Sequence, residues 1–190
     1  GICRYTGNFT VPTVTYPNSA FAGSYDPFWF NTDLLLHFDG SNGGTTITDS
    51  SINAASLTRS GVTTSTAQTK FGTAAGYFNG TSYLTGSSAS YTIGTNDFTI
   101  EGWVYFSALS SDVGIVQTSA PSTSPSNSGP SVGKLTGKWG ITYATGYTLA
   151  STAPSTGQWY HFALVRIGTS LKLYIDGTSV ISVSDSTNYT

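Results

Sequence analysis

The chain has 190 residues, a net charge of −2 at pH 7 and 8% charged residues, against about 25% in an average soluble domain. This length fits one all-β domain, and the seven Lys and Arg residues form no cluster, so we expect neither nucleic acid nor membrane as a partner. Cys3 is the only cysteine, which excludes an internal disulfide framework, and no apolar run approaches the roughly 18 residues of a membrane span.

Residues 1–32 are predicted to form an extended N-terminal arm or linker. Pro12, Pro17 and Pro27 remove backbone donors and favour extended or turn conformations, although residues 2–9 are compatible with a short strand. Burying one large apolar side chain is worth roughly 1.5–3 kcal/mol, so the aromatic residues of the arm should lie against a protein surface. These residues are Phe21, Tyr25, Phe28, Trp29 and Phe30.

The compact domain is predicted to begin with a buried strand at residues 33–38, which a turn dipeptide ends. A stretch rich in Thr and Ser at 58–70 is placed only as loop or edge. Segments 74–78 and 82–85 flank an Asn-Gly dipeptide, which is a strong signal for a two-residue hairpin. We therefore expect these two segments to pair with each other.

The strand predicted at 97–107 alternates an apolar face with a second face that contains Glu101 and Trp103. That second face is either partly exposed to water or moved by a bulge at Gly102. Further along the chain we predict a strand at 113–118, a long surface loop at 119–133 and a strand at 138–145.

A meander is predicted towards the end of the chain, with strands at 158–167, 170–175 and 178–184. Each break is about two residues long, and Asp176-Gly177 suits a type I′ turn. The first of these strands is apolar on both faces, as in the centre of a sandwich. Since no segment shows helical periodicity over three turns, we expect almost no helix.

Two blocks of this sequence resemble laminin-G-like modules with the concanavalin A-like lectin fold. One block is Trp159 to Arg166 followed by residues 171–177, and the other is 78–84 followed by 97–104. The resemblance implies an antiparallel β-sandwich of jelly-roll type over residues 33–190. It implies no particular activity, because one fold hosts unrelated functions.

In tandem members of this family, carried by proteins of tailed-phage particles, a module ends on a strand Ala-Arg-Tyr-Thr-Xaa-Asn-Phe and a proline-rich link. Residues 3–12 resemble that ending, displaced to the front of the chain. We therefore expect a piece of a longer polypeptide, whose last module lacks its last strand. The sheet edge left open after residue 184 would be filled by a strand such as 2–9, from its own or another chain. Residues 1–32 would then contact other copies or neighbouring virion proteins.

Oxygen donors gather near the end of the strand predicted at 33–38, as a calcium ion requires. The candidate ligands are Asp39, Asp49 and Asn42, with Asp33 and Ser41 nearby. Asp and Asn are also ordinary turn residues, and we favour that interpretation. Calcium stays open as the alternative.

Glu101 is the only glutamate, and glycoside hydrolysis generally needs two carboxylates about 5–9.5 Å apart. Glucanases of this fold carry a Glu-x-Asp-x-x-Glu strand, whereas no second acid follows Glu101 here. We therefore expect no catalytic residue. His37 and His161 lie within apolar runs without a nucleophile motif, so they are predicted to be core histidines.

Aromatic side chains provide flat apolar faces for stacking on sugar rings, and Trp29, Tyr25 and Tyr147 are the candidate carbohydrate-binding residues. We expect a non-enzymatic structural and adhesive module of an extracellular virion appendage, such as a fibre, spike or decoration. Weak contacts with a cell-surface glycan would be strengthened by many copies. The alternatives are a calcium-dependent lectin or receptor-binding module and, third, a glycoside hydrolase.

Overall fold

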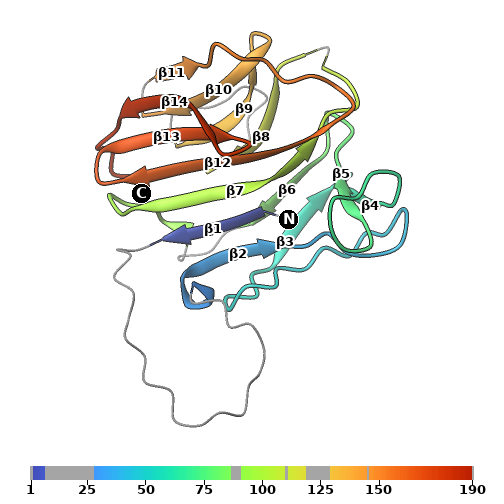
Figure 1. Cartoon of the computed structure of the whole chain (residues 1–190). Coiled ribbons are helices and arrows are strands. Elements are labelled where there is room, and N and C mark those ends of the chain that lie inside the picture. Colours follow the sequence, from blue (N-terminus) through green and yellow to red (C-terminus); the bar gives the residue numbers. More distant parts are fainter. Residues whose placement is uncertain are drawn as a thin grey trace, which may run out of the picture.

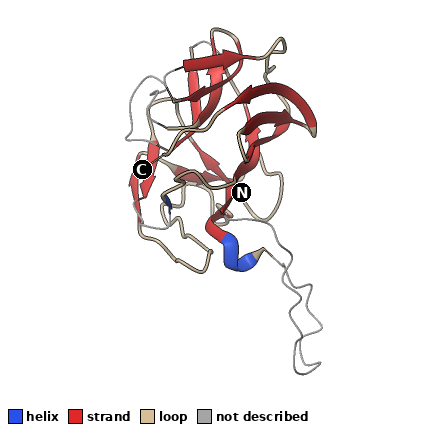
Figure 2. Cartoon of the chain, turned by 90° about the vertical axis from the view of Figure 1, so that its left-hand side faces the viewer, coloured by secondary structure: helices blue, strands red, loops and turns tan. Residues whose placement is uncertain are grey.

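The chain folds into antiparallel strands, and the computed structural model describes residues 2–6, 28–86, 91–109, 111–118, 129–144 and 146–189. Within these ranges helical residues are confined to 3-10 turns, including η1 (Trp29–Asn31), and no helix is long and apolar enough to cross a membrane. A six-stranded and a four-stranded sheet pack against each other, with two short strand pairs beside them (Figure 1, Figure 2). The predicted all-β antiparallel sandwich is confirmed.

The larger sheet has the strand order β14-β13-β12-β7-β1-β2. Its strands are β14 (Thr178–Ser184), β13 (Ser170–Ile175), β12 (Trp159–Ile167), β7 (Phe98–Tyr105), β1 (Ile2–Thr6) and β2 (Thr32–Leu36). The predicted meander is confirmed as β12, β13 and β14. At its second turn Asp176 has φ 48° and Gly177 φ 78°, the two positive angles that a type I′ turn requires.

The surface loop predicted at 119–133 extends too far along the chain, because a strand of the smaller sheet begins at Ser131. The strands of this sheet are β11 (Gly146–Leu149), β10 (Lys138–Tyr143), β9 (Ser131–Leu135) and β8 (Val113–Gln117). Every residue of β9 is buried, including Ser131 and Lys134. The Ser131 hydroxyl lies 2.6 Å from the Thr142 hydroxyl, and Lys134 Nζ donates to the Leu109 carbonyl at 3.1 Å. A search for apolar alternation misses this strand, because two of its buried residues are polar and form hydrogen bonds inside the protein.

The hairpin predicted at the Asn-Gly dipeptide is wrong. The two short strand pairs are β3 (Leu57–Ser60) with β6 (Tyr83–Gly86) and β4 (Thr63–Ser65) with β5 (Ala75–Tyr77). β5 and β6 therefore pair with different strands. Asn79 Oδ1 accepts the backbone N–H groups of Thr81 and Ser82 at 3.0 and 2.9 Å, so its side chain closes an Asx turn.

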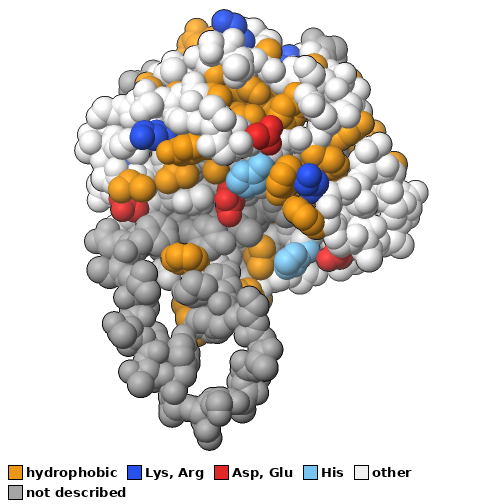
Figure 3. Space-filling view, in the orientation of Figure 1, with side chains coloured by type: hydrophobic (Ala, Val, Ile, Leu, Met, Phe, Trp, Pro, Cys, Tyr) orange, Lys and Arg blue, Asp and Glu red, His pale blue; other side chains and the backbone are white. Residues whose placement is uncertain are grey.

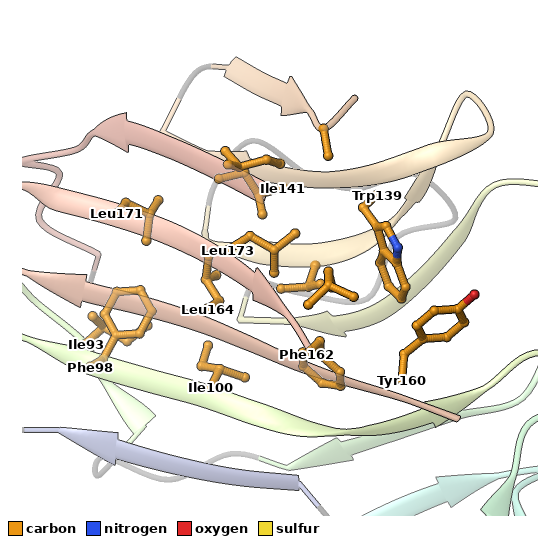
Figure 4. Close-up of a cluster of buried hydrophobic side chains, with 14 of the residues drawn as sticks. Ile93, Phe98, Ile100, Trp139, Ile141, Tyr160, Phe162, Leu164, Leu171 and Leu173 are labelled. Atoms are coloured by element: carbon orange, nitrogen blue, oxygen red, sulfur yellow. The ribbon is translucent and has the colours of Figure 1, made fainter. Parts of the chain in front are cut away.

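The core lies between the two larger sheets. β7, β12 and β13 direct alternate side chains inward, where they meet Trp139 and Ile141 of β10 (Figure 4). Side chains with at most 1% exposure line this layer: Phe98, Ile100, Trp139, Ile141, Phe162, Leu164, Leu171 and Leu173. Each contributes roughly 1.5–3 kcal/mol through burial, so the layer holds the sheet faces in fixed register.

Residues 2–6 form an interior strand instead of an arm. β1 pairs with β7 along one edge and with β2 along the other, whereas among the described residues no strand pairs with the outer edge of β14. The strand predicted at 2–9 is thus confirmed for 2–6, but within this chain it does not lie beside β14. That a strand of another chain fills the β14 edge stays a prediction. The gap between β7 and β2 offers two ladder edges, and β14 offers only one. Residues 7–27 of the predicted arm lie outside the described residues.

Changing Gly133 to alanine is expected to lower the free energy of unfolding by about 1–3 kcal/mol, because the added carbon would overpack a buried strand. A Cβ at this position would lie 2.3 Å from the carbonyl oxygen of Val113. Gly114, opposite Gly133 on β8, is the matched control, since a Cβ there meets nothing closer than 3.6 Å. Urea denaturation of Gly133→Ala and Gly114→Ala checks this; equal losses would contradict it.

Candidate functional site

The outer face of the six-stranded sheet carries a group of aromatic side chains. The inward residues of β7 and β12 are buried, so the intervening residues face outward: Glu101, Trp103 and Tyr105 from β7, and Trp159 and His161 from β12. All five are intermediate in exposure. Of the two alternatives at Gly102, partial exposure to water is therefore correct, and the ladder between β7 and β12 contains no register shift there.

The aromatic rings form two pairs across the strand boundary. Trp103 and His161 are directly opposed, with ring centroids 5.2 Å apart, and Tyr105 and Trp159 are directly opposed with centroids 5.6 Å apart. The two pairs are successive outward positions on the same strands. Because outward positions on a strand are separated by about 7 Å, the four rings form a continuous patch on a rigid sheet.

A loop between β4 and β5 extends this patch. Lys70 Nζ lies 4.0 Å from the centroid of the Trp103 ring, and the Phe71 ring meets Trp103 edge-on at 5.9 Å. Phe71 is 65% exposed. We name Phe71, Trp103, Tyr105, Trp159 and His161, with Lys70 and Glu101, the aromatic face. Figure 3 shows hydrophobic side chains gathered around a histidine on this side of the molecule, with acidic and basic groups beside them.

Glu101 and His161 supply polar groups within the aromatic face. Glu101 Oε2 lies 3.5 Å from His161 Nε2, and the side chains are 32% and 28% exposed. The prediction of two core histidines is wrong, because His161 is half-buried on the outer face and His37 is exposed just after β2. Asp176 also borders His161, where its Oδ1 accepts the backbone N–H at 2.9 Å. A carboxylate and an imidazole beside flat rings can hydrogen-bond to hydroxyl groups of a ligand.

The three residues predicted to bind carbohydrate do not form one site. Trp29 is half-buried in η1, below the sheets, whereas Tyr147 is 63% exposed on β11 at the opposite end of the molecule (Figure 1, Figure 2). Tyr25 lies outside the described residues. The aromatic face was missed, although the alternation within 97–107 and 158–167 already placed its strand residues on one side of each strand.

Asp49, a candidate calcium ligand, is 4% exposed and is engaged by four donors of its own chain. Its Oδ1 accepts the backbone N–H groups of Leu35 and Ser51, and its Oδ2 accepts the Ser51 hydroxyl and the Ala55 N–H, all within 3.0 Å. Burial alone would raise the pKa of Asp49, but these hydrogen bonds outweigh it and hold the pKa below its usual value. The carboxylate fastens the loop after β2 to that strand.

Asp39 and Asn42, the other candidate ligands, also serve loop contacts. Asp39 Oδ1 accepts the Thr73 N–H at 2.7 Å, and this bond lowers the pKa of Asp39. Asn42 Oδ1 accepts the Thr66 N–H at 3.3 Å. Within the described ranges no three His, Cys, Asp or Glu side chains are grouped so that they could hold a metal ion. These contacts are turn chemistry, and calcium binding stays a prediction.

A second hollow lies beside the short strand pairs. It is an open depression of about 250 Å³, lined by Asn42, Gly43, Thr63, Thr64, Ser65 and Tyr77. Its lining offers amide and hydroxyl groups and a single aromatic ring, that of Tyr77. The Thr64 hydroxyl already donates to the Ser41 carbonyl at 2.6 Å. The aromatic face, with five rings beside a carboxylate and an ammonium group, is the stronger candidate for ligand binding.

Comparison with known families agrees with this fold. The model of the concanavalin A-like lectin/glucanases superfamily, of laminin-G type, matches residues 78–190. The matched part contains β7 and β12, and with them the two ring pairs of the aromatic face. No curated protein and no solved structure matches the chain.

Proposed function

Because the chain belongs to the concanavalin A-like lectin/glucanase superfamily, a fold that supports carbohydrate binding and adhesion, we propose that it is a non-enzymatic adhesive module that binds polysaccharide through the aromatic face. The observation that carries this proposal is the pair of ring contacts, Trp103 with His161 and Tyr105 with Trp159, held half-exposed on adjacent strands. Buried rings would serve packing alone. Half-exposed rings fixed by a sheet are preorganised for a ligand.

The chemistry of the aromatic face suits a sugar chain with little charge. Sugar rings present C–H groups that pack on aromatic rings and hydroxyl groups that need polar partners. The four strand-borne rings extend over roughly 7 Å along the strands and about 5 Å across them, which matches one or two sugar rings. Glu101 and Lys70 lie beside these rings and, with the imidazole of His161, can accept or donate hydrogen bonds.

We propose binding instead of hydrolysis because β7 and β12 together carry one acidic residue. Glycoside hydrolysis by this type of fold uses two carboxylates on either side of the scissile bond. Glu101 is the only acid within β7 and β12, and it faces the imidazole of His161. Asp176, the acid next to His161, is engaged with a backbone N–H at a turn.

The proposed setting is an extracellular assembly, most specifically a fibre, spike or decoration of a virion. Two observations support it. Residues 3–12 resemble the closing strand and link of tandem phage modules, and the surface is poor in charge and rich in Ser and Thr. In such an assembly a weak single site is sufficient, because many copies acting together raise the overall affinity.

Replacing Trp103 or Trp159 with alanine is expected to weaken polysaccharide binding about tenfold each, since a stacked ring contributes about 1–1.5 kcal/mol beyond its area. A glycan array identifies the ligand, and affinity electrophoresis with that polysaccharide measures the change. Tyr147→Ala is the matched control: it removes an exposed ring from the other sheet and should leave binding unchanged.

Three outcomes would contradict the proposal. Binding lost in Tyr147→Ala but kept in Trp103→Ala would assign the site to β11, as the sequence predicted. Release of reducing sugar from the bound polysaccharide, abolished in Glu101→Gln, would make the module a hydrolase. Absence of binding to any glycan at millimolar concentration would leave a purely structural role.

A further inference from the structure

β1 occupies a slot that is one strand wide. β7 and β2 are not paired with each other in the described sheet, and each bonds to β1 instead. On the β7 side the ladder runs from Ile2 opposite Gly102 to Thr6 opposite Phe98, and on the β2 side Cys3 lies opposite Leu35. Without β1, both walls of the slot would present free backbone donors and acceptors, which is the arrangement that captures an extended strand.

A long connection joins β1 to β2. β12, β13 and β14 follow one another through two-residue turns, whereas 25 residues, 7–31, separate β1 from β2. The entropic advantage of an intramolecular contact falls as the connecting loop lengthens. The backbone ladder itself is the same whichever copy of the chain supplies the strand, which is the condition for low-cost exchange of an element between copies.

We propose that the slot between β2 and β7 also accepts residues 2–6 of a second copy, so that copies of this chain are joined by strand exchange. The connecting residues 7–27 can span at most about 70 Å when extended. The radius of gyration of a 190-residue domain is about 16 Å, so a strand can reach the slot of a neighbouring copy. This linkage itself involves no sugar ligand.

Whether β1 inserts into its own slot or into the slot of a second copy depends on the concentration of the chain. A strand that is covalently joined to its own domain can have an effective concentration in the millimolar range at its own slot. Neighbouring copies in an ordered assembly, or chains refolding together at high concentration, offer slots at comparable concentration. Exchange then competes with self-insertion, and each exchanged strand becomes a non-covalent link of several hydrogen bonds on both edges.

The single cysteine of the chain provides a direct test. Cys3 of β1 lies opposite Leu35 of β2 in the ladder. The Leu35 N–H donates to Asp49 and its carbonyl accepts from Ser50, so both groups point away from β1 and the pair with Cys3 is a non-hydrogen-bonded one. Opposed Cα atoms in such a pair are about 4.5 Å apart, within the range that a disulfide bridges.

The experiment mixes two full-length chains that differ in tag. The donor is the wild-type chain, and the acceptor carries Cys3→Ser with Leu35→Cys, so a mixed disulfide is strongly favoured when the donor's β1 lies beside the acceptor's β2. The two are unfolded together, refolded at sub-millimolar concentration and oxidised gently, and the heterodimer is quantified on a non-reducing gel. Cys3→Ser with Ser182→Cys, which places the thiol on β14, is the matched control acceptor.

We expect at least tenfold more heterodimer with the Leu35→Cys acceptor than with the Ser182→Cys acceptor. A second acceptor, Cys3→Ser with Glu101→Cys on the β7 wall of the slot, should behave like the first, because Cys3 is also opposite Glu101. It keeps the test valid if Leu35→Cys impairs folding, which circular dichroism detects. Heterodimer at the control level with both acceptors overturns the proposal, and so does equal capture by Ser182→Cys, which would place the donor strand at the edge of β14.

Discussion

Replacing Arg166 with methionine is expected to lower the free energy of unfolding by about 3–5 kcal/mol, the cost of leaving one partner of a buried ion pair without the other. Arg166 Nη1 lies 3.3 Å from Asp185 Oδ2, and both side chains are 1% exposed. Methionine retains the volume of the aliphatic stem, so the loss reports the charge and its hydrogen bonds more than a cavity.

The guanidinium of Arg166 fastens two segments to the sheet. It donates to the carbonyls of Gly94 and Asn96, just before β7, at 2.7 and 2.8 Å, and to the Thr187 carbonyl, after β14, at 2.9 Å. It also lies over the Phe98 and Tyr189 rings, 5.0 and 5.2 Å from their centroids. The Asn96 and Thr187 carbonyls would lose this donor in the methionine variant, which adds to the cost, whereas the Gly94 carbonyl still accepts the Tyr189 N–H at 3.1 Å.

Asp185 stays charged in this buried setting. Burial alone would raise the pKa of Asp185, but hydrogen bonds from Thr187 and Tyr189 and the charge of Arg166 outweigh it and keep the pKa below its usual value. Tyr189 donates its hydroxyl to Asp185 Oδ2 at 2.9 Å, and burial with this bond raises the pKa of Tyr189 to about 12. Removing Arg166 therefore leaves a buried carboxylate with reduced compensation.

Urea denaturation at neutral pH measures this effect. Lys138→Met, which removes an exposed cation from β10, is the matched control and should change the free energy of unfolding by less than about 0.5 kcal/mol. Adding Asp185→Asn to Arg166→Met should recover part of the loss, because the unpaired charge disappears. A loss in Arg166→Met as small as in Lys138→Met would show that the ion pair does not hold these segments.

The strands that could be predicted from the sequence are those whose pattern is local. The meander of β12, β13 and β14 follows from two-residue breaks and from alternation on β13, and the structure reproduces its bounds to within one residue. β9 could not be found in this way, because Lys134 and Ser131 are polar and their burial depends on Leu109 and Thr142, far along the chain. The sequence also does not predict which strands pair with each other. β5 and β6 flank a turn, yet β5 pairs with β4 and β6 pairs with β3.

The candidate site also has a part that the sequence predicts and a part that depends on tertiary structure. Trp103 and Tyr105 were assigned to one face of their strand, and the ladder between β7 and β12 then decides that Trp159 and His161 stand opposite them. Neither the pairing of two strands with 53 residues between them nor the approach of Lys70 to Trp103 has a signature in a single sequence. Composition therefore pointed to exposed aromatics on the arm and on β11, while tertiary pairing created the aromatic face.

Replacing Asp49 with alanine is expected to lower the free energy of unfolding by about 3 kcal/mol or more, because hydrogen bonds to a charged acceptor contribute about 1.5–3 kcal/mol each. The change leaves the N–H groups of Leu35, Ser51 and Ala55 without their acceptor in a region where Asp49 is 4% exposed. Asp39→Ala should cost less, because the Asp39 carboxylate is exposed and water can replace its partner.

The pH dependence and the response to calcium separate the two interpretations of Asp49. Its pKa is lowered in the folded state, so its contribution is complete above about pH 3.9, the ordinary value for Asp, and is lost as the pH falls through the lowered value. The difference between wild type and Asp49→Asn should therefore shrink in acid. Thermal melts with calcium and with a chelator should coincide for the wild type if the carboxylate serves the loop alone. A calcium-dependent rise in Tm that Asp49→Asn abolishes would instead make Asp49 a metal ligand, because only an ion bound to the folded state stabilises it.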